Sequence, residues 1–304
     1  MDTYKNIGFS IIIPSYNSAN TIRTCLNSVL EQRTKTAYEV IVVDSSSDET
    51  ASIIERDYPA VKLIKFDSKT DPGTARNAGV KVSAGDVIVF TDSDCIVPED
   101  WIDKYKEAYL KNDNNLIIGG AIVNGNPETL VSIAGYMIEF SDNMPTVPGG
   151  EVLSIPTCNI SYKKSIFKKY GGYHSEFYPQ EDYYFHWKLN KAGEKIVFSP
   201  DIQIKHFHRE KMSEYLKHQI RFGNITAQVL KITDLPGHFF VKRWWLAPLF
   251  LPFLPLIKMW RTSKRVICYA PRIVFKELVI FPIMFLGLMY WWVGFVKGIY
   301  SIKK

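Results

Sequence analysis

Residues 87–94 read Val-Ile-Val-Phe-Thr-Asp-Ser-Asp, an apolar run of four residues that ends in two carboxylates. A short apolar run of this kind, bounded by polar residues, predicts a strand that is buried on both faces. Three similar runs precede it along the chain, at Phe9–Ile13, Val40–Val43 and Val61–Phe66. The spacing between them leaves room for crossover helices, which parallel strands require.

Helix-like segments fill the gaps between the predicted strands. They are Ala19–Glu31, Glu49–Arg56 and Thr74–Val82. This βαβ order predicts an α/β protein with a Rossmann-like, mainly parallel central sheet. Further strands are expected at Leu116–Val123 and Ser154–Ser161, and further helices at Tyr183–Lys191 and Met212–Ile232.

The charge of the chain is unevenly distributed. The formal net charge is +6 over 304 residues, but the sequence from Phe239 onward has eleven basic residues and one acid. The last 66 residues therefore carry +10, and the residues before them carry −4. With 46% hydrophobic residues, the chain is too apolar for a disordered protein. We expect two regions that lie in different surroundings.

The N-terminal sequence and the cysteines indicate a reducing compartment. The first apolar run ends at Pro14 after five residues, which is too short for the core of a signal peptide. The four cysteines are widely separated and form neither a Cys-x-x-Cys pair nor a zinc-ligand pattern. The part of the chain before Phe239 is therefore expected in the cytosol.

The last 66 residues contain two uncharged segments. Trp244–Ile257 is interrupted by three prolines, whereas Leu278–Val296 has 19 residues, close to the length of about 20 that spans a bilayer. Two spans would put the basic loop Lys258–Glu277 outside, against the positive-inside rule. The sequence therefore favours an interfacial first segment with the loop against anionic head groups, and leaves the second open between spanning and interfacial.

Acidic residues follow two of the predicted strands at their carboxyl ends. Asp92 and Asp94 follow Val87–Phe90, and Asp44 follows Val40–Val43. Ligands of open α/β sheets bind at this edge. Two carboxylates so placed suit a Mg²⁺ or Mn²⁺ ion that neutralises charge on a diphosphate. An Asp-x-Asp pair is also common in solvated turns, so its position after a buried strand carries the argument.

With these motifs in order, the chain resembles the family 2 glycosyltransferases, which are inverting enzymes of the glycosyltransferase A fold. Five motifs within Phe9–Arg221 carry the resemblance. They are Ile-Pro-Ser-Tyr-Asn (13–17), Val-Asp-Ser-Ser-Ser-Asp (43–48), Gly-Thr-Ala-Arg-Asn-Ala-Gly (73–79), Asp-Ser-Asp (92–94) and Glu-Asp (181–182). Ser45-Ser46 departs from the Asp-Gly of many members. Together with the strand and helix pattern and the change of charge at Phe239, the resemblance predicts a catalytic domain over residues 1–238, with a nucleotide-sugar half (1–115) and an acceptor half (116–238), followed by a membrane-associated helical tail (239–304).

The resemblance also implies roles for individual residues. Those expected to bind the nucleotide sugar are Pro14, Tyr16, Asp44, Asp71, Arg76, Asp92 and Ser93. Pro14, Tyr16 and Asp44 would bind the base, and Asp94 would be the main metal ligand. Arg76 offers a planar cation for the pyrophosphate or for ordering the carboxylates.

An inverting transfer needs a carboxylate that removes the proton of the acceptor hydroxyl. The resemblance makes Asp182 the candidate base, with Glu181 orienting it or binding the acceptor. Acids at the start of a helix also stabilise the helix dipole. His206 and His208 alternate along a strand-like segment and so face one side. Either could complete the metal site, and His206 is favoured.

Taken together, these features predict a metal-dependent, inverting glycosyltransferase of the hexosyltransferase type at the cell membrane. Its catalytic domain is expected on the cytoplasmic side, where nucleotide sugars of the UDP, GDP or dTDP type occur. The expected acceptor is a hydroxyl of a lipid-linked saccharide or other glycan, with membrane lipids and no nucleic acid as further partners. The alternatives are a polyisoprenyl-phosphate glycosyltransferase and a non-catalytic membrane scaffold. The donor, the acceptor and the oligomeric state stay open.

Overall fold

The computed structural model describes residues 8–111, 114–243, 245, 251–271 and 278–301. The chain divides into two compact units. The first comprises the residues up to Val123, Pro148–Glu176 and Glu181–His206, and the second comprises Asn124–Val147, Phe177–Gln180 and the residues from Phe207. The predicted domain boundary at residue 238 stays a prediction.

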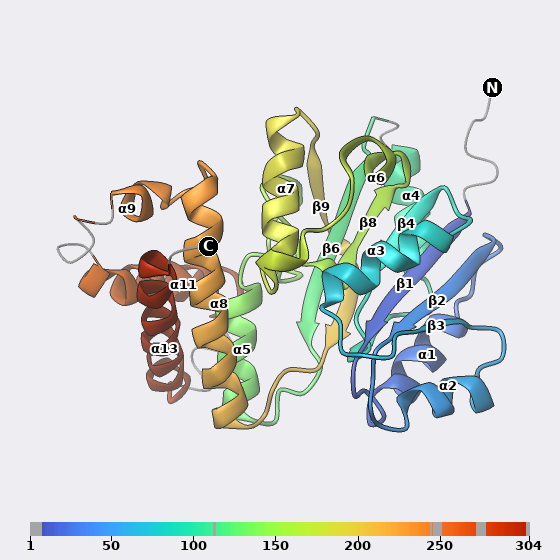
Figure 1. Ribbon diagram of the computed structural model, residues 1–304, viewed down its shortest axis with the longest axis horizontal. Coiled ribbons are helices and arrows are strands. Elements are labelled where there is room, and N and C mark those ends of the chain that lie inside the picture. Colours follow the sequence, from blue (N-terminus) through green and yellow to red (C-terminus); the bar gives the residue numbers. More distant parts are fainter. Residues whose placement is uncertain (1–7, 112–113, 244, 246–250, 272–277, 302–304) are drawn as a thin grey trace. The chain divides into compact units, whose positions relative to one another are not determined.

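One mixed sheet forms the core of the first unit (Figure 1). Within the described residues it has nine strands, in the order β3-β2-β1-β4-β8-β6-β9-β5, with β7 paired to β9. The strands are β1 (Phe9–Ser15), β2 (Tyr38–Asp44), β3 (Lys62–Lys65), β4 (Val87–Phe90), β5 (Cys95–Ile96), β6 (Ile117–Asn124), β7 (Gly150–Val152), β8 (Ile160–Lys163) and β9 (Ile196–His206).

The predicted βαβ order is confirmed. Strands β1 to β4 lie side by side and pair in parallel, and every residue of β1 and β4 is buried. Burial on both faces explains why these strands are continuously apolar rather than alternating. The helices of this unit are α1 (Ile22–Leu30), α2 (Thr50–Asp57), α3 (Pro72–Val82), α4 (Trp101–Lys111), α6 (Ser165–Tyr170) and α7 (Glu181–Lys191). Helix α3 packs on β1 and β2.

The strand expected at Ser154–Ser161 is wrong in its position. A 3-10 turn, η1 (Thr157–Asn159), occupies the middle of this segment, and β8 begins only at Ile160. The turn directs the buried side chain of Asn159 into the unit, where its oxygen accepts hydrogen bonds from Trp101 and Tyr105 at 3.0 and 2.8 Å. Its amide donates to the carbonyl oxygens of Ala121 and Ile202. A fully satisfied buried side chain fixes the turn, and no periodicity of apolar residues signals it.

Helices make up the second unit. They are α5 (Leu130–Phe140), α8 (Met212–Ile232), α9 (His238–Lys242), α11 (Leu254–Tyr269) and α13 (Ile280–Tyr300); short 3-10 turns lie at η2 (Ser175–Phe177), where the first unit passes into the second, and at η4 (Leu251–Phe253). Helix α8 has the predicted bounds, and α13 is the expected second apolar segment of the tail. Six of the 14 residues of the predicted segment Trp244–Ile257 lie outside the described residues, and its last seven belong to η4 and the start of α11.

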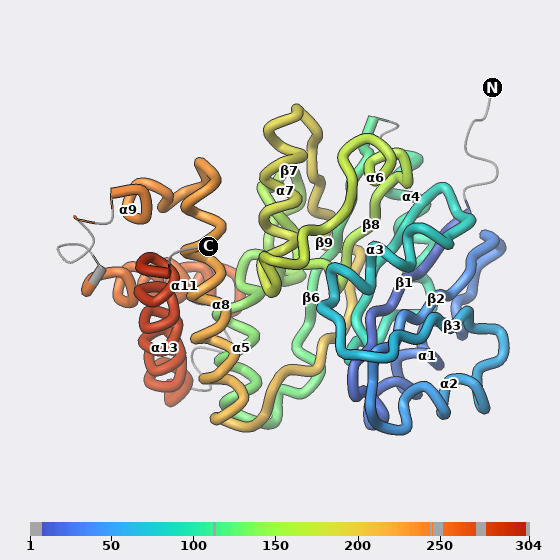
Figure 2. Tube along the Cα trace, viewed as in Figure 1, coloured from blue at the N-terminus to red at the C-terminus, as the bar shows by residue number. Residues whose placement is uncertain are grey.

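Glycines bring α8 and α13 into close contact along their length (Figure 2). A Cβ atom at Gly294 would collide with the carbonyl oxygen of Ile220, and one at Gly298 with that of Asn224. A Cβ atom at Gly223 of α8 would likewise collide with the carbonyl oxygen of Trp291. Small residues allow helix backbones to approach closely. One face of α13 is therefore covered by α8.

Candidate active site

The loops after β1 and β2 meet at the carboxyl edge of the parallel strands. Ser15 pairs with Asp44 in the β1–β2 register, and Asp44 is buried. Its carboxylate accepts hydrogen bonds from the backbone nitrogen of Ser46 at 3.2 Å and from its hydroxyl at 2.6 Å. Ser46 is one of the two residues that depart from the family pattern. Its hydroxyl holds Asp44 in place, so this departure supplies a new partner for the aspartate.

The loop after β1 is shaped by Asn17, which has a positive φ of 51°. The side-chain oxygen of Asn17 accepts a hydrogen bond from the backbone nitrogen of Ser47 at 2.9 Å. The backbone nitrogen of Asn17 donates one to the Ser46 hydroxyl at 2.7 Å. Asparagine tolerates this left-handed conformation better than most residues. The ring of Tyr16 is exposed, with the ammonium of Lys69 4.0 Å from its centroid. Pro14 is buried in β1.

Helix α3 begins at this edge and carries Arg76 into the interior. Asp71 caps the helix, because its carboxylate accepts hydrogen bonds from the nitrogen and the hydroxyl of Thr74 at 3.0 and 2.6 Å. The position of Gly73 is tight, since a Cβ there would lie 3.0–3.2 Å from atoms of Asp71, Glu181 and Tyr173. The helix start is therefore fixed against its surroundings.

Arg76 joins two of the predicted functional motifs. Its guanidinium donates to Asp92 at 2.6 Å and to Glu181 at 3.1 Å. Arg76 and Glu181 are both buried, whereas Asp92 is 28% exposed. Arg76 and Glu181, which are 105 positions apart in the sequence, are thus held together by this contact.

Burial raises the pKa of both acids at the start of α7, Glu181 and Asp182. Burial and the neighbouring Asp182 raise the pKa of Glu181 to about 8, although Arg76 acts in the opposite direction. Burial also raises the pKa of Asp182, and Asp92 adds to this effect against Arg76. The carboxylate of Asp182 accepts hydrogen bonds from the backbone nitrogens of Tyr183 at 2.7 Å and Thr157 at 3.4 Å. A half-buried carboxylate with a raised pKa is suited to accept a proton.

A second group of side chains lies next to Asp92. The ligand atoms of Asp94, Cys95 and His206 all lie within 4.8 Å of one another. The His206 Nε2 atom is 3.6 Å from Asp94 Oδ1. The hydroxyl groups of Ser93 and Ser18 form a hydrogen bond of 2.7 Å. Oxygen, sulfur and nitrogen donors this close together fit a divalent cation. Cys95 was not among the predicted ligands, because only its pairing with His206 across β5 and β9 brings it there.

His208 has a different environment from His206. It belongs to the second unit, where its ring lies 5.5 and 5.3 Å from the rings of Tyr136 and Phe140. Its backbone nitrogen donates to Asn126 at 2.7 Å. Among the described residues, the group of metal-ligating atoms includes His206 and not His208.

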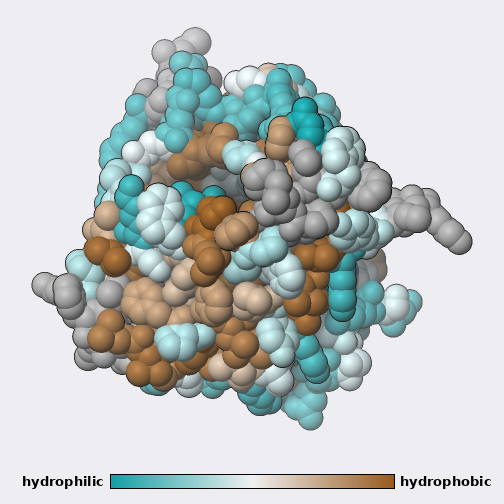
Figure 3. Space-filling view, turned by 90° about the vertical axis from the view of Figure 1, so that its left-hand side faces the viewer, coloured by the Kyte–Doolittle hydropathy of each residue, from teal (hydrophilic) through white to brown (hydrophobic). Residues whose placement is uncertain are grey.

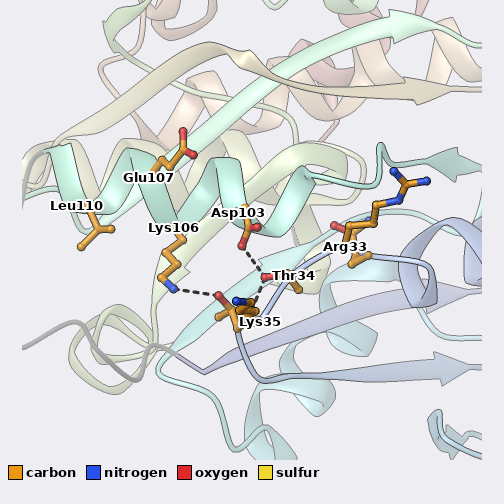
Figure 4. Close-up of a pocket in the computed structure, with 9 residues that line it drawn as sticks. Arg33, Thr34, Lys35, Asp103, Lys106, Glu107 and Leu110 are labelled. Atoms are coloured by element: carbon orange, nitrogen blue, oxygen red, sulfur yellow. Dashed lines mark hydrogen bonds between the residues drawn. The ribbon is translucent and has the colours of Figure 1, made fainter.

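A separate pocket of about 730 Å³ lies in the first unit. Figure 4 shows its lining residues from α4 and from the loop after α1. Lys106 donates a hydrogen bond to Thr36, and Thr34 donates one to Asp103. The loop leads into the amino end of β2, whereas the predicted ligand-binding residues follow carboxyl ends. This pocket is therefore distinct from the candidate site.

The model of Glycosyl transferase family 2 matches residues 10–171, which is more than half of the chain. The chain belongs to this family. Its members transfer sugars, so the chain is a glycosyltransferase that uses a nucleotide-sugar donor. The resemblance predicted from the five motifs is thereby confirmed.

Two known proteins match most of this chain in sequence. Glycosyltransferase AglE of Haloferax volcanii is 27% identical over 256 residues, which cover 81% of this chain and 82% of AglE. The poly-beta-1,6-N-acetyl-D-glucosamine synthase of Staphylococcus aureus is 28% identical over 233 residues, which cover 73% of this chain. The match spans only 55% of the synthase.

Solved structures confirm the predicted glycosyltransferase A fold. One is the mannosyltransferase PcManGT from Pyrobaculum calidifontis in complex with GDP-Man and Mn²⁺, with a TM-score of 0.63 at 18% identity. The match covers 98% of this chain and 88% of the PcManGT chain. S. aureus TarS 1–349 in complex with UDP-GlcNAc has a TM-score of 0.54 at 20% identity, covering 94% of this chain and 90% of that chain.

Proposed function

We propose that this glycosyltransferase is inverting and metal-dependent, and that it adds a sugar to a hydroxyl of a lipid-linked saccharide or other glycan at the cytoplasmic face of the cell membrane. The observation that carries the proposal is the bridge from Asp92 through Arg76 to Glu181. Asp92 belongs to the Asp-x-Asp motif, and Glu181 precedes the proposed base, Asp182. One buried cation therefore links the proposed donor and acceptor groups.

The donor is proposed to be a sugar nucleotide of the UDP, GDP or dTDP type. GDP-Man is bound in PcManGT and UDP-GlcNAc in TarS, both of which share the fold. In this chain Pro14, Tyr16 and Asp44 are proposed to bind the base. Asp71, Arg76, Asp92 and Ser93 are proposed to lie along the nucleotide and its sugar.

The reaction we propose is a single displacement at the anomeric carbon. Asp182 takes the proton of the acceptor hydroxyl while the hydroxyl oxygen forms a bond to the anomeric carbon. The bond between that carbon and the diphosphate oxygen breaks, and its electron pair leaves with the nucleoside diphosphate. Asp94 and His206 would hold a Mg²⁺ or Mn²⁺ ion, which would neutralise negative charge on the diphosphate. Burial raises the pKa of Asp182 and so makes its carboxylate a stronger base.

Replacing the proposed base tests the nature of the acceptor. In Asp182→Asn, transfer to a hydroxyl acceptor should fall by about 10²–10⁴-fold, while binding of the nucleotide is retained. Asp201→Asn is the matched control, because Asp201 is an exposed carboxylate on β9 of the same unit. If Asp182→Asn kept full activity, an ionised acceptor such as a polyisoprenyl phosphate would explain the result better than a hydroxyl.

The second unit supports the proposed membrane association. Apolar side chains gather on the face shown in Figure 3. The large apolar residues that are exposed on α11 and α13 are Leu256, Ile257, Trp260, Ile267, Phe285, Leu286, Tyr290, Val293 and Tyr300. Exposed apolar surface on this scale is typical of a binding face. Arg261 and Lys264 lie exposed on α11, which favours anionic lipid head groups.

We propose that α13 lies in the plane of the membrane surface. By length and hydropathy it is the one helix among the described residues that could cross a bilayer. Its glycine face is covered by α8, which carries the exposed charges of Glu214, Lys217 and Arg221. A spanning α13 would draw these charges into the hydrocarbon region, where each costs about 2.5 kcal/mol or more. An interfacial position leaves them in water.

Labelling of both ends of α13 tests this orientation. Leu278→Cys and Ser301→Cys, each in a Cys268→Ser background, are bound to sealed anionic vesicles and treated outside with an impermeant maleimide. We expect full labelling at both positions. Protection of one of the two positions would show that α13 spans, and failure of the protein to bind the vesicles would contradict membrane association altogether.

A further inference from the structure

Cys95 lies beside the two other members of the proposed metal site. Its Sγ atom is 3.9 Å from Asp94 Oδ1, and its side chain is 1% exposed. Cys95 is directly opposite His206 in the antiparallel pair of β5 and β9. Residues directly opposite each other in such a pair point to the same face of the sheet. The thiol and the imidazole therefore face the same small volume, next to the carboxylate of Asp94.

The neighbouring cysteines differ from Cys95 in this respect. Cys25 and Cys158 are also buried. The thiol of Cys25 donates to the backbone oxygen of Asp92 at 3.4 Å. Neither Cys25 nor Cys158 belongs to the group of metal-ligating atoms found among the described residues. Burial alone therefore does not distinguish Cys95, whereas its position beside Asp94 and His206 does.

We propose that Cys95 is a third protein ligand of the metal and that it makes the site selective for thiophilic cations such as Zn²⁺ and Co²⁺ over Mg²⁺. This inference rests on the metal site of the proposed function. Magnesium prefers oxygen ligands only, whereas imidazole and thiolate ligands favour the later first-row metals. On binding, the thiol releases its proton to solvent and the sulfur donates an electron pair to the cation.

The first test is a spectroscopic titration of the full chain with Co²⁺ alone. A sulfur ligand gives a thiolate-to-cobalt charge-transfer band in the near ultraviolet. We expect this band in the wild type and in Cys158→Ser, which removes a neighbouring buried thiol, and we expect its loss in Cys95→Ser. Co²⁺ that binds to the wild type without the band would overturn the inference.

The second test measures selectivity by competition against bound Mn²⁺. Loss of a residue that merely orients a metal ligand costs about 10–100-fold in affinity, so Cys95→Ser should lose at least this much for Zn²⁺, and its affinity for Mg²⁺ should change far less. Equal losses for both cations, or no loss for Zn²⁺, would contradict a ligand role and leave Cys95 as a core residue.

X-ray absorption of the Co²⁺-loaded wild type needs no variant and so covers the case in which Cys95→Ser does not fold. We expect one sulfur scatterer in the first coordination shell, and a shell of oxygen and nitrogen alone would overturn the inference. The outcomes also separate the two proposals. A protein that binds no divalent cation, even with a nucleoside diphosphate added, contradicts the proposed metal dependence as well as the role of Cys95.

Discussion

The two units of the chain distribute charge and apolar surface in opposite ways. In the first unit a guanidinium and a carboxylate, Arg76 and Glu181, are buried inside the fold. In the second unit large apolar side chains such as Leu256 and Trp260 remain exposed. Soluble proteins usually bury apolar groups and expose charges. Each exception coincides with a part of the molecule where we propose that a ligand or a membrane binds.

The buried ion pair of the first unit should give the largest effect. At about pH 9, above the raised pKa of Glu181, Arg76→Met leaves the Glu181 carboxylate without its partner inside the protein, which should destabilise the fold by about 3–5 kcal/mol. Lys81→Met changes an exposed cation on the same helix and should cost less than about 0.5 kcal/mol. Urea unfolding of both variants measures the difference. Equal stability of the two would show that the bridge is not an important part of the fold.

The apolar face of the second unit should give the next largest effect, on membrane binding. Leu256→Ser removes an exposed leucine of α11, and Leu110→Ser removes one of similar exposure from α4 of the first unit. Burial of a leucine stabilises binding by about 1.5–3 kcal/mol, which is about tenfold or more in affinity. Flotation with anionic vesicles should therefore show weaker binding for Leu256→Ser alone. Similar losses in both variants would mean that the apolar face has no special role.

The ionisation of Glu181 should make the stability of the first unit depend on pH. Burial and Asp182 raise its pKa to about 8 in the folded chain, against about 4.3 in an unfolded one. Between these values the folded state binds more protons, so this contribution is complete below about pH 4 and is lost as the pH rises through about 8.

Urea unfolding at pH 5 and pH 8.5 tests this sign. The wild type should lose stability between the two values, and Glu181→Gln should lose less. Glu176→Gln changes an exposed acid and should follow the wild type. A loss in Glu181→Gln that equals the loss in the wild type would exclude Glu181 as the cause.

The smallest effect is expected at the loop that departs from the family pattern. Ser46→Ala removes the hydroxyl that donates to Asp44, a hydrogen bond worth about 0.5–1.5 kcal/mol. The KM for the donor should rise a few-fold while kcat changes little. Ser47→Ala removes a hydroxyl that bonds to Asn17 and not to Asp44, so it is the control. An unchanged KM in Ser46→Ala would contradict a role of this hydroxyl in holding Asp44.

Much of the first unit could be predicted because β1, β4 and most of β2 are buried on both faces and are therefore largely apolar. The succession of β1 to β4 along the chain, and the carboxylates that come at the ends of β2 and β4, follow from this pattern. The turn at Thr157–Asn159 could not be predicted, because it depends on the buried hydrogen bonds of Asn159 with distant residues. Contacts of this kind leave no periodic signal in the sequence.

Two further features depend on pairing between segments that are far apart in the chain. Cys95 joins Asp94 and His206 only through the register of β5 and β9. The covered face of α13 depends on Gly294 and Gly298 meeting α8, whereas the sequence shows only an uncharged segment of helical length. The length of that segment left spanning and interfacial positions open, and its packing favours the interfacial one.

The release of nucleoside diphosphate tests the central claim most directly. The full chain is incubated with UDP, GDP and dTDP sugars in turn, with native membranes and with Mn²⁺ or Mg²⁺. We predict release from one class of donor, loss of release on chelation of the metal, and a product whose anomeric configuration is inverted. Release from none of the donors, or a product that keeps the configuration of the donor, would contradict the account.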